Sequence, residues 1–191
     1  MLDDPWLKAK IVELLSEHEN MAIATLRPDG WPQTTMVGYV HDELTLYFAS
    51  ALKSQKLANI RRDDRISIAL GHEEPTRLRG LSMAAFAQPV ENISEIDAVN
   101  DLMRERYHAR AIFSPRETAS VLVRVSPIVI SVIDLGKGPG KPHLATVTGE
   151  GAVKCITCRG SGGSTREVPV HVVQSYNGGT GPGAVGEGHN R

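Results

Sequence analysis

The architecture of this chain follows from the stretch Met21-Ala-Ile-Ala-Thr-Leu-Arg-Pro-Asp-Gly-Trp-Pro-Gln-Thr-Thr-Met-Val-Gly-Tyr-Val40. Its first six residues are small or apolar and predict a short strand. Arg27–Gly30 follows as a turn, because Pro and Gly occupy positions that a tight turn favours. Trp31–Val40 is then the returning strand, and Leu44–Ser50 is a third strand after the connection His41-Asp42. We expect these three runs to form an antiparallel meander.

The flanking sequence adds helices and further strands. The Asp4-Pro5 pair begins a helix over about 5–20, in which Leu7, Ile11, Leu14 and Leu15 share one face. Other helices are predicted at about 54–62 and 94–108, and other strands at 65–70, at 78–90 with a kink near Gly80, and at 120–125 and 128–133, separated by Ser126-Pro127. Hairpin-rich sheets of this size usually close into a barrel, because closure removes their unpaired edges. The expected fold class is mainly β (α+β), a barrel of about six to seven mostly antiparallel strands with about three helices.

The composition changes sharply after Leu135. Residues 136–191 hold 14 of the 18 glycines, and Tyr176 is their only aromatic residue. Such a segment buries little apolar surface to offset the entropy of ordering its backbone. We therefore expect a folded domain at residues 1–135 and a mostly disordered tail at residues 136–191.

Charge and hydropathy exclude several classes of function. The chain has 22 acidic and 21 basic residues and a net charge of -1, without the basic excess of a general nucleic-acid surface. No apolar run approaches the roughly 20 residues that span a bilayer. The N-terminal Met-Leu-Asp-Asp-Pro lacks the basic and apolar regions of a signal peptide. We expect a cytoplasmic protein that binds neither nucleic acid nor membrane.

The segment Ser50-Ala-Leu-Lys-Ser-Gln-Lys56 joins the third strand to the next helix. It brings two hydroxyls and two ammonium groups to a helix start, where unpaired N–H groups and the helix dipole already favour anions. A phosphate monoester suits this arrangement. Alternatively, Ser54 is an ordinary helix cap and Lys53 and Lys56 are solvated charges. The segment alone leaves both readings open.

Several stretches together resemble one known family: Ala22-Ile-Ala-Thr-Leu-Arg-Pro-Asp-Gly-Trp-Pro32, Leu46-Tyr-Phe-Ala-Ser50, Ser54-Gln-Lys56 and Asn59-Ile-Arg-Arg-Asp-Asp-Arg-Ile-Ser67. In order and spacing they are similar to the pyridoxamine 5'-phosphate oxidase-like family, the FMN-binding split β-barrel proteins. The similarity covers roughly residues 7–140. The resemblance implies a homodimer with two FMN sites at the subunit interface.

The resemblance also implies which residues bind the cofactor. A strand from Gln33 to Gly38 would lie along the flavin ring, and the end of the third strand would continue that contact. The start of the following helix would hold the phosphate. The implied cofactor-binding residues are Gln33, Thr34, Thr35, Met36, Val37, Phe48, Ala49, Ser50, Ser54, Gln55 and Lys56. Thr34–Val37 is also explained as an ordinary strand rich in β-branched residues.

The chain departs from the oxidases of this family at several positions. Gln33 stands where they have a phosphate-binding arginine, and Gly38 stands where they have a substrate-binding lysine. Gln55 replaces a second cation, and nothing after Leu135 resembles their C-terminal substrate segment. We therefore do not expect oxidation of a pyridoxine phosphate, and the deazaflavin F420 becomes an alternative to FMN.

The leading functional hypothesis is an FMN-dependent oxidoreductase that transfers hydride between a small-molecule substrate and the flavin. No residue is identified as a catalytic acid or base. A non-enzymatic flavin-binding or stress-related module is the alternative from a different class. Arg104-Glu-Arg-Tyr-His108 could bind an anionic substrate or could simply end a helix, where cations are favourable. Arg61 and Arg62 carry the same ambiguity.

Cys155-Ile-Thr-Cys158 resembles one half of a DnaJ-type zinc site. A structural zinc needs four ligands, so a dimer or His143 and His171 would have to complete the set. A redox pair or two free thiols are the other interpretations. A third functional hypothesis is therefore a zinc-linked dimer whose tail binds a partner protein. The histidines show no spacing typical of a catalytic metal.

Overall fold

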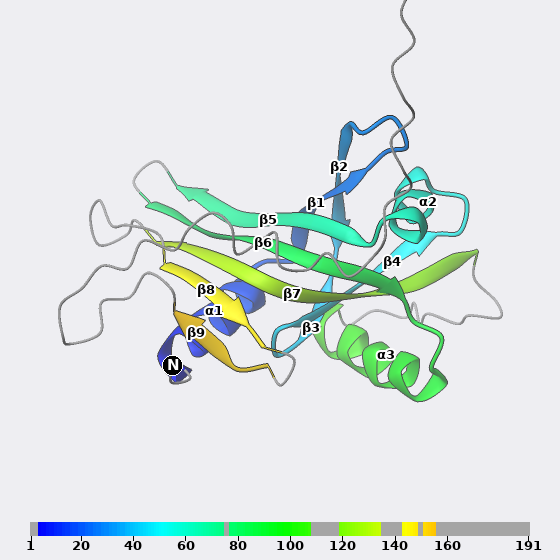
Figure 1. Cartoon of the computed structure of the whole chain (residues 1–191). Coiled ribbons are helices and arrows are strands. Elements are labelled where there is room, and N and C mark those ends of the chain that lie inside the picture. The colour runs from blue at the N-terminus through cyan, green and yellow to red at the C-terminus, as the bar shows by residue number, and fades with distance from the viewer. Residues whose placement is uncertain (1–3, 75–76, 108–118, 135–142, 149–150, 156–191) are drawn as a thin grey trace, which may run out of the picture. The chain divides into compact units, whose positions relative to one another are not determined.

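The computed structural model describes residues 4–74, 77–107, 119–134, 143–148 and 151–155. All of them belong to one compact unit, Met1–Cys158, and Arg159–Arg191 lies outside the described residues. The elements are α1 (Pro5–Glu17), β1 (Asn20–Leu26), β2 (Pro32–Gly38), β3 (Val40–Asp42), β4 (Thr45–Ala51), α2 (Gln55–Arg62), β5 (Arg65–Glu74), β6 (Arg77–Pro89), α3 (Ile93–Tyr107), β7 (Ser120–Asp134), β8 (His143–Val147) and β9 (Val153–Cys155) (Figure 1).

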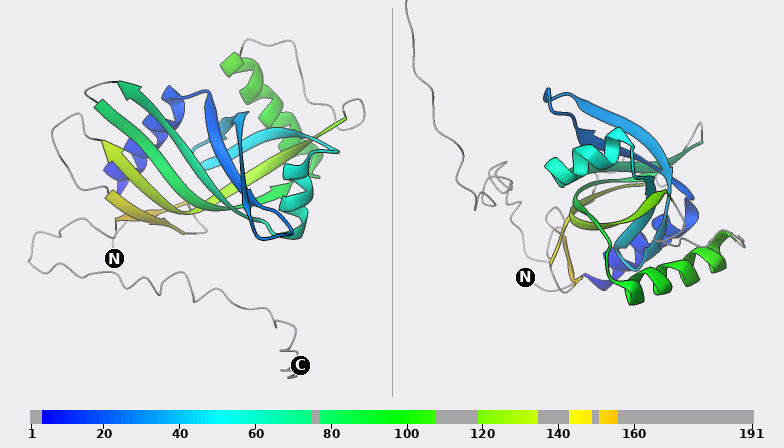
Figure 2. Two further views of the ribbon diagram at one scale, coloured as in Figure 1. Left: turned by 90° about the horizontal axis from the view of Figure 1, so that it is seen from above. Right: turned by 90° about the vertical axis from the view of Figure 1, so that its right-hand side faces the viewer.

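The strands form one antiparallel sheet that curls into a barrel (Figure 2). Along it the order is β2-β1-β5-β6-β7-β4-β3. The two end strands, β2 and β3, are separated in sequence only by Tyr39, so the two edges of the sheet must come together. The expected α+β barrel is confirmed. The expected meander is instead two hairpins, β1–β2 and β3–β4, because β4 pairs with β3 and β7 and not with β2.

Tyr39, at the point where the two edges of the sheet meet, forms hydrogen bonds through its hydroxyl, its N–H and its carbonyl. Its ring is buried, with 1% of its surface exposed, and burial raises the pKa of its hydroxyl. That hydroxyl donates to the Leu15 carbonyl at 2.7 Å, and its backbone N–H donates to the Glu19 carbonyl at 3.2 Å. The Tyr107 hydroxyl of α3 donates to the Tyr39 carbonyl at 2.7 Å. The ends of α1 and α3 therefore fix the closure of the barrel.

Two apolar clusters account for the position of the helices. The large one lies inside the barrel and includes the predicted face of α1 and two side chains of α2: Leu7, Ile11, Leu14, Leu15, Leu57 and Ile60. The smaller one packs α3 on the outside of β3, β4 and β7 through Val40, Tyr47, Val90, Ile96, Val99 and Leu122. Within this smaller cluster, burial and the Glu95 carboxylate raise the pKa of the Tyr47 hydroxyl to about 12. Asp4 caps α1 as predicted, accepting from Leu7 N–H at 3.0 Å.

One long strand replaces the two predicted on either side of Ser126-Pro127. β7 runs unbroken from Ser120 to Asp134, and Ile128 is an extra residue opposite the Ala84–Ala85 step of β6. This bulge accommodates Pro127, which has no N–H to donate to a ladder. β6 itself is continuous through Gly80, and the irregularity of this strand pair is the β7 bulge opposite Ala84 and Ala85. Gly80 serves close packing, because a Cβ there would lie 2.4 Å from the Leu70 carbonyl oxygen of β5.

The sheet also continues past residue 135, where the sequence predicted the end of the folded domain. β8 pairs with β7, and β9 pairs with β8. Ala145 and Val153 are fully buried in the barrel core, and Asp4 N–H donates to the Val153 carbonyl at 2.7 Å. The glycine-rich composition of the whole segment conceals these two short strands. The expected tail beyond residue 155 lies outside the described residues.

Removal of β8 and β9 should destabilise the barrel. A chain that ends at Gly140 loses the buried Ala145 and Val153 side chains, and we expect its free energy of unfolding to fall by about 2 kcal/mol or more. For a domain of this size, that corresponds to a melting temperature lower by about 4–8 °C. Thermal unfolding followed by circular dichroism measures this, with a chain that ends at Cys158 as the control. Equal melting temperatures for the two truncated chains would contradict the expectation.

Candidate functional site

The connection from β4 to α2 places two serine hydroxyls together at the start of a helix. Ser54 is the N-cap of α2, and its Oγ accepts from Leu57 N–H at 3.2 Å. The Ser50 Oγ lies 2.9 Å from the Ser54 Oγ, and Ser50 is buried. Ser54 is thus a helix cap, and its hydroxyl is at the same time one half of a hydrogen-bonded pair at the positive end of the helix.

Lys56 places a partly desolvated ammonium group in the first turn of α2. Its Nζ lies 5.6 Å from the centre of the buried Phe48 ring. Burial lowers the pKa of this ammonium group. Within the described part of the chain, no carboxylate pairs with it. A cation that has lost part of its hydration and lacks a counter-ion is favourable for binding an anion.

A buried asparagine of α2, Asn59, connects this helix with β1 and β2. Asn59 has 1% of its surface exposed. Its Nδ2 donates to Thr25 Oγ1 of β1 at 3.0 Å and to Gln33 Oε1 of β2 at 3.1 Å. Gln55 Nε2 donates to Asn59 Oδ1 at 2.9 Å. Sequence reasoning missed Asn59 and Thr25. The available signal was an asparagine of low helix propensity in mid-helix, four residues after a glutamine that can hydrogen-bond to it.

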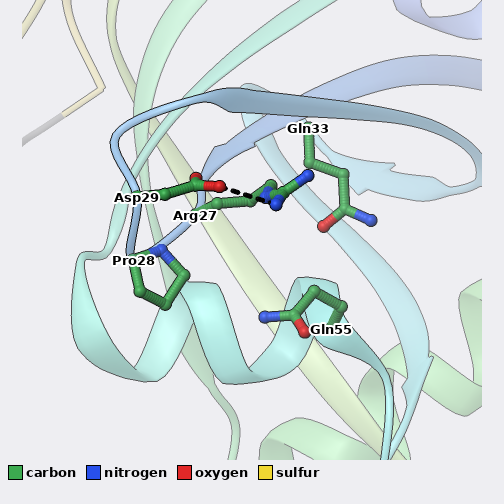
Figure 3. Close-up of a pocket in the computed structure, with 5 residues that line it drawn as sticks. All are labelled: Arg27, Pro28, Asp29, Gln33 and Gln55. Atoms are coloured by element: carbon green, nitrogen blue, oxygen red, sulfur yellow. Dashed lines mark hydrogen bonds and ion pairs between the residues drawn. The ribbon is translucent and has the colours of Figure 1, made fainter.

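A pocket of about 470 Å³ opens above this network, lined by Arg27, Pro28, Asp29, Gln33 and Gln55. In Figure 3, Gln33 extends downward from β2, and Gln55 lies below it on α2 with its side chain directed along the helix toward Pro28. Arg27 and Asp29 form an ion pair at 2.6 Å at its side. Beneath the turn, Arg62 Nη2 donates to the Leu26 and Arg27 carbonyls at 2.7 and 2.8 Å and holds α2 in place.

The remaining residues implied by the family resemblance alternate between two faces of their strands. On β2, Gln33 and Thr35 are half-buried and Val37 is buried, whereas Thr34 and Met36 are exposed on the opposite side. On β4, Ala49 is exposed between buried Phe48 and Ser50. The structure therefore links the residues of three pairs, Ser50 with Ser54, Phe48 with Lys56, and Gln33 with Gln55 through Asn59. Thr34, Met36 and Ala49 lie on the outer surface.

The basic cluster at the end of α3 has a structural role. Arg106 Nη2 donates to the carbonyls of Leu15, Ser16 and His18 at the C-terminal end of α1. Its guanidinium lies 5.4 Å from the centre of the Tyr39 ring. These contacts stabilise the negative pole of α1. The Arg106 guanidinium, a candidate for substrate binding, is therefore already engaged in bonds within the protein. Arg104 pairs with Asp101, and His108 lies outside the described residues.

The described residues contain no cluster of three or more His, Cys, Asp or Glu that could hold a metal ion. Cys158 lies outside them, and only the backbone of Cys155 is described, at the end of β9. His143 packs edge-on against Trp6, with ring centres 6.0 Å apart. None of the helices described is both long and apolar enough to cross a membrane.

Comparison with known proteins agrees with this fold. A family model described as pyridoxamine 5'-phosphate oxidase matches residues 7–133. A pyridoxamine 5'-phosphate oxidase candidate from Listeria innocua is 22% identical with a TM-score of 0.56, over 66% of this chain and 98% of that one. The conserved hypothetical protein Rv2991 from Mycobacterium tuberculosis is 26% identical with a TM-score of 0.58, over 70% and 89%.

A heme-binding protein from Mycobacterium smegmatis is 17% identical with a TM-score of 0.60, over 76% of this chain and 59% of that one. The search of curated proteins found no match. At these identities the solved structures show a shared fold, and one of these neighbours is described as heme-binding.

Replacement of Arg106 should destabilise the protein without changing its binding site. Arg106→Met leaves the last carbonyls of α1 without their cationic donor, and we expect a loss of about 1.5–3 kcal/mol. Arg104→Met removes an exposed i,i+3 ion pair and should change stability by less than about 0.5 kcal/mol. Urea unfolding of the two variants measures the difference. Equal destabilisation would show that the contacts of Arg106 with α1 carry no special weight.

Proposed function

The chain belongs to the pyridoxamine 5'-phosphate oxidase family, and we propose on this premise that it is an FMN-dependent oxidoreductase acting on a small molecule. The observation that carries the proposal is Lys56, a half-buried ammonium group without a carboxylate partner among the described residues, in the first turn of α2. We do not expect a pyridoxine phosphate as the substrate, because Gly38 occupies the position of the lysine that would bind it in the oxidases of the family.

The residues at the start of α2 fit a phosphate monoester. The hydroxyls of Ser50 and Ser54 lie side by side at 2.9 Å. Ser54 Oγ caps the Leu57 N–H, and the N–H groups before it, at the start of α2, have no intrahelical acceptors. Lys56 adds a charge-assisted donor. A phosphate here would also gain from the helix dipole and would neutralise the desolvated ammonium.

The flavin ring is proposed to lie along β2. The backbone of Thr34 and Thr35 and one of their two hydroxyls, which lie on opposite faces of the strand, would offer donors to its polar edge, and Met36 and Ala49 offer exposed apolar contacts. The bound flavin supplies the hydride-transfer chemistry. The chain binds the phosphate, orients the ring and shields one of its faces. No described residue is assigned as a general acid or base.

A homodimer is proposed to complete this site. Among the described strands, only β1 pairs with β2, so one edge of β2 is free. Met36 in β2 and Trp31 just before it expose 66% and 72% of their surface. Large exposed apolar side chains next to an unpaired strand edge are typical of a protein–protein interface. A second copy placed there would cover the exposed side of the flavin.

The proposal is tested by the absorbance spectrum of the purified protein and by titration with FMN and F420. Tight binding of FMN, followed by its reduction on anaerobic addition of a nicotinamide cofactor, would support the oxidoreductase. A bound flavin that no nicotinamide cofactor reduces would favour the non-enzymatic binding module. Failure to bind either flavin would overturn the proposal.

Loss of the Lys56 charge should weaken the cofactor complex. Lys56→Ala removes a charge-assisted hydrogen bond, which is worth about 1.5–3 kcal/mol, or roughly ten- to a hundredfold in FMN affinity. Lys53→Ala is the matched control, because its exposed ammonium is screened by solvent and should change affinity by less than about threefold. Fluorescence titration with FMN measures both. Unchanged affinity in Lys56→Ala would remove Lys56 from the phosphate site.

A charge on the exposed face of β2 should dissociate the dimer. Met36→Asp brings two desolvated carboxylates into the proposed interface, and we expect a monomer in sedimentation at micromolar concentration. Ile93→Asp changes an equally exposed apolar residue at the start of α3 and should leave the dimer intact. A wild-type protein that sediments as a monomer would contradict the shared site.

A further inference from the structure

The pocket beside α2 carries no net charge. Of its five lining residues, only Arg27 and Asp29 are ionised, and they neutralise each other in an ion pair at 2.6 Å. The two other polar side chains, Gln33 and Gln55, are neutral amides. An anion entering here would meet the Asp29 carboxylate and find no free cation among the lining residues. The pocket therefore favours a neutral group over a phosphate or carboxylate.

The buried Asn59 determines what the two glutamines present to that group. Gln33 uses its Oε1 to accept from Asn59 Nδ2, which leaves the Gln33 Nε2 as a donor. Gln55 uses its Nε2 to donate to Asn59 Oδ1, which leaves the Gln55 Oε1 as an acceptor. If the oxygen and nitrogen of all three amides were exchanged, the pocket would still present one donor and one acceptor. The pairing is therefore the same in both arrangements of the three amides that keep the two bonds to Asn59.

We propose that Gln33 and Gln55 bind a neutral amide of the substrate, a carboxamide or cyclic amide whose C=O and N–H face the same side. The C=O of such a group would accept from the Gln33 Nε2, and its N–H would donate to the Gln55 Oε1, the two atoms that the bonds to Asn59 leave available. A carboxylate matches only one of the two, because both of its oxygens are acceptors and one of them would face the Gln55 oxygen without a hydrogen between them. This inference rests on the proposed function, because it assigns the class of substrate that the same site binds. It also assigns Gln33 and Gln55 to substrate binding, whereas the family resemblance implied that they bind the cofactor.

Nicotinamide and nicotinate are the probes, because they differ only in carboxamide against carboxylate. Titration of the full-length protein is followed by the NMR signals of the glutamine side-chain NH₂ groups. We expect nicotinamide to shift the Gln33 and Gln55 signals. It should bind at least about tenfold more tightly than nicotinate, because nicotinate cannot form the hydrogen bond to the Gln55 oxygen. Equal or tighter binding of nicotinate, or displacement of nicotinamide by equimolar inorganic phosphate, would overturn the proposal.

Variants of the glutamines test the assignment without disturbing the core. Gln55 is exposed, and Gln55→Met keeps its length but removes the acceptor, so nicotinamide affinity should fall about tenfold. Gln88→Met is the matched control, because Gln88 is exposed on β6 and contacts Arg124 instead. Unchanged affinity in Gln55→Met, or equal losses in both variants, would overturn the assignment.

A third variant tests the role of Asn59 in setting the polarity. In Asn59→Asp, studied at a pH high enough to ionise the buried carboxyl, the group only accepts, so both glutamines should turn their NH₂ groups inward and present two acceptors. The preference for nicotinamide should then be lost in favour of benzamidine, which offers two donors. If this variant still preferred nicotinamide, Asn59 would not determine which atoms of Gln33 and Gln55 face the ligand. FMN titration of the same samples separates the claims: flavin binding without amide preference overturns only this inference, and amide preference without flavin binding overturns only the proposed function.

Discussion

One buried tyrosine joins the two edges of the sheet, and the barrel depends on its being fully paired. Tyr39 is the single residue between β2 and β3, which end the strand order on opposite sides. A polar group buried without a partner is destabilising by about 1–3 kcal/mol. The segment at the end of α1 supplies acceptors for the hydroxyl and N–H of Tyr39, and α3 supplies a donor for its carbonyl. Closure of the sheet therefore requires both helices, although about 90 residues of sequence separate their contact points.

The candidate site is a consequence of that closure. Once the edges meet, α2 lies against β1, β4 and β6 at one end of the barrel. Asn59 can then bond simultaneously to Thr25 and Gln33. A site assembled from the ends of several strands is rigid where it is bonded to the core and open where the strand edge is free. This division suits a ligand with one anchored end and one reactive end.

Local sequence signals predicted most of the elements and part of the site. Asp4 and Ser54 are helix caps because their short polar side chains compete for the first N–H groups, an interaction within three residues. The contacts that sequence reasoning missed are long-range. Arg106 reaches α1 across 91 residues, and Asn59 reaches β1 across 34. The strands β8 and β9 were missed for a different reason, since two short strands in a glycine-rich segment have almost no periodic signal.

Both tryptophans of the chain lie at the surface, and their exposure determines what the intrinsic fluorescence of the protein can measure. Trp6 exposes 64% and Trp31 72% of its surface, and there is no third tryptophan. Neither indole leaves an apolar core when the barrel unfolds, so the emission maximum of a folded monomer is already that of a hydrated indole. Trp31 follows the turn that borders the pocket, and Trp6 touches His143. Intrinsic fluorescence is therefore a probe of what covers these two faces, and a poor probe of whether the barrel is folded.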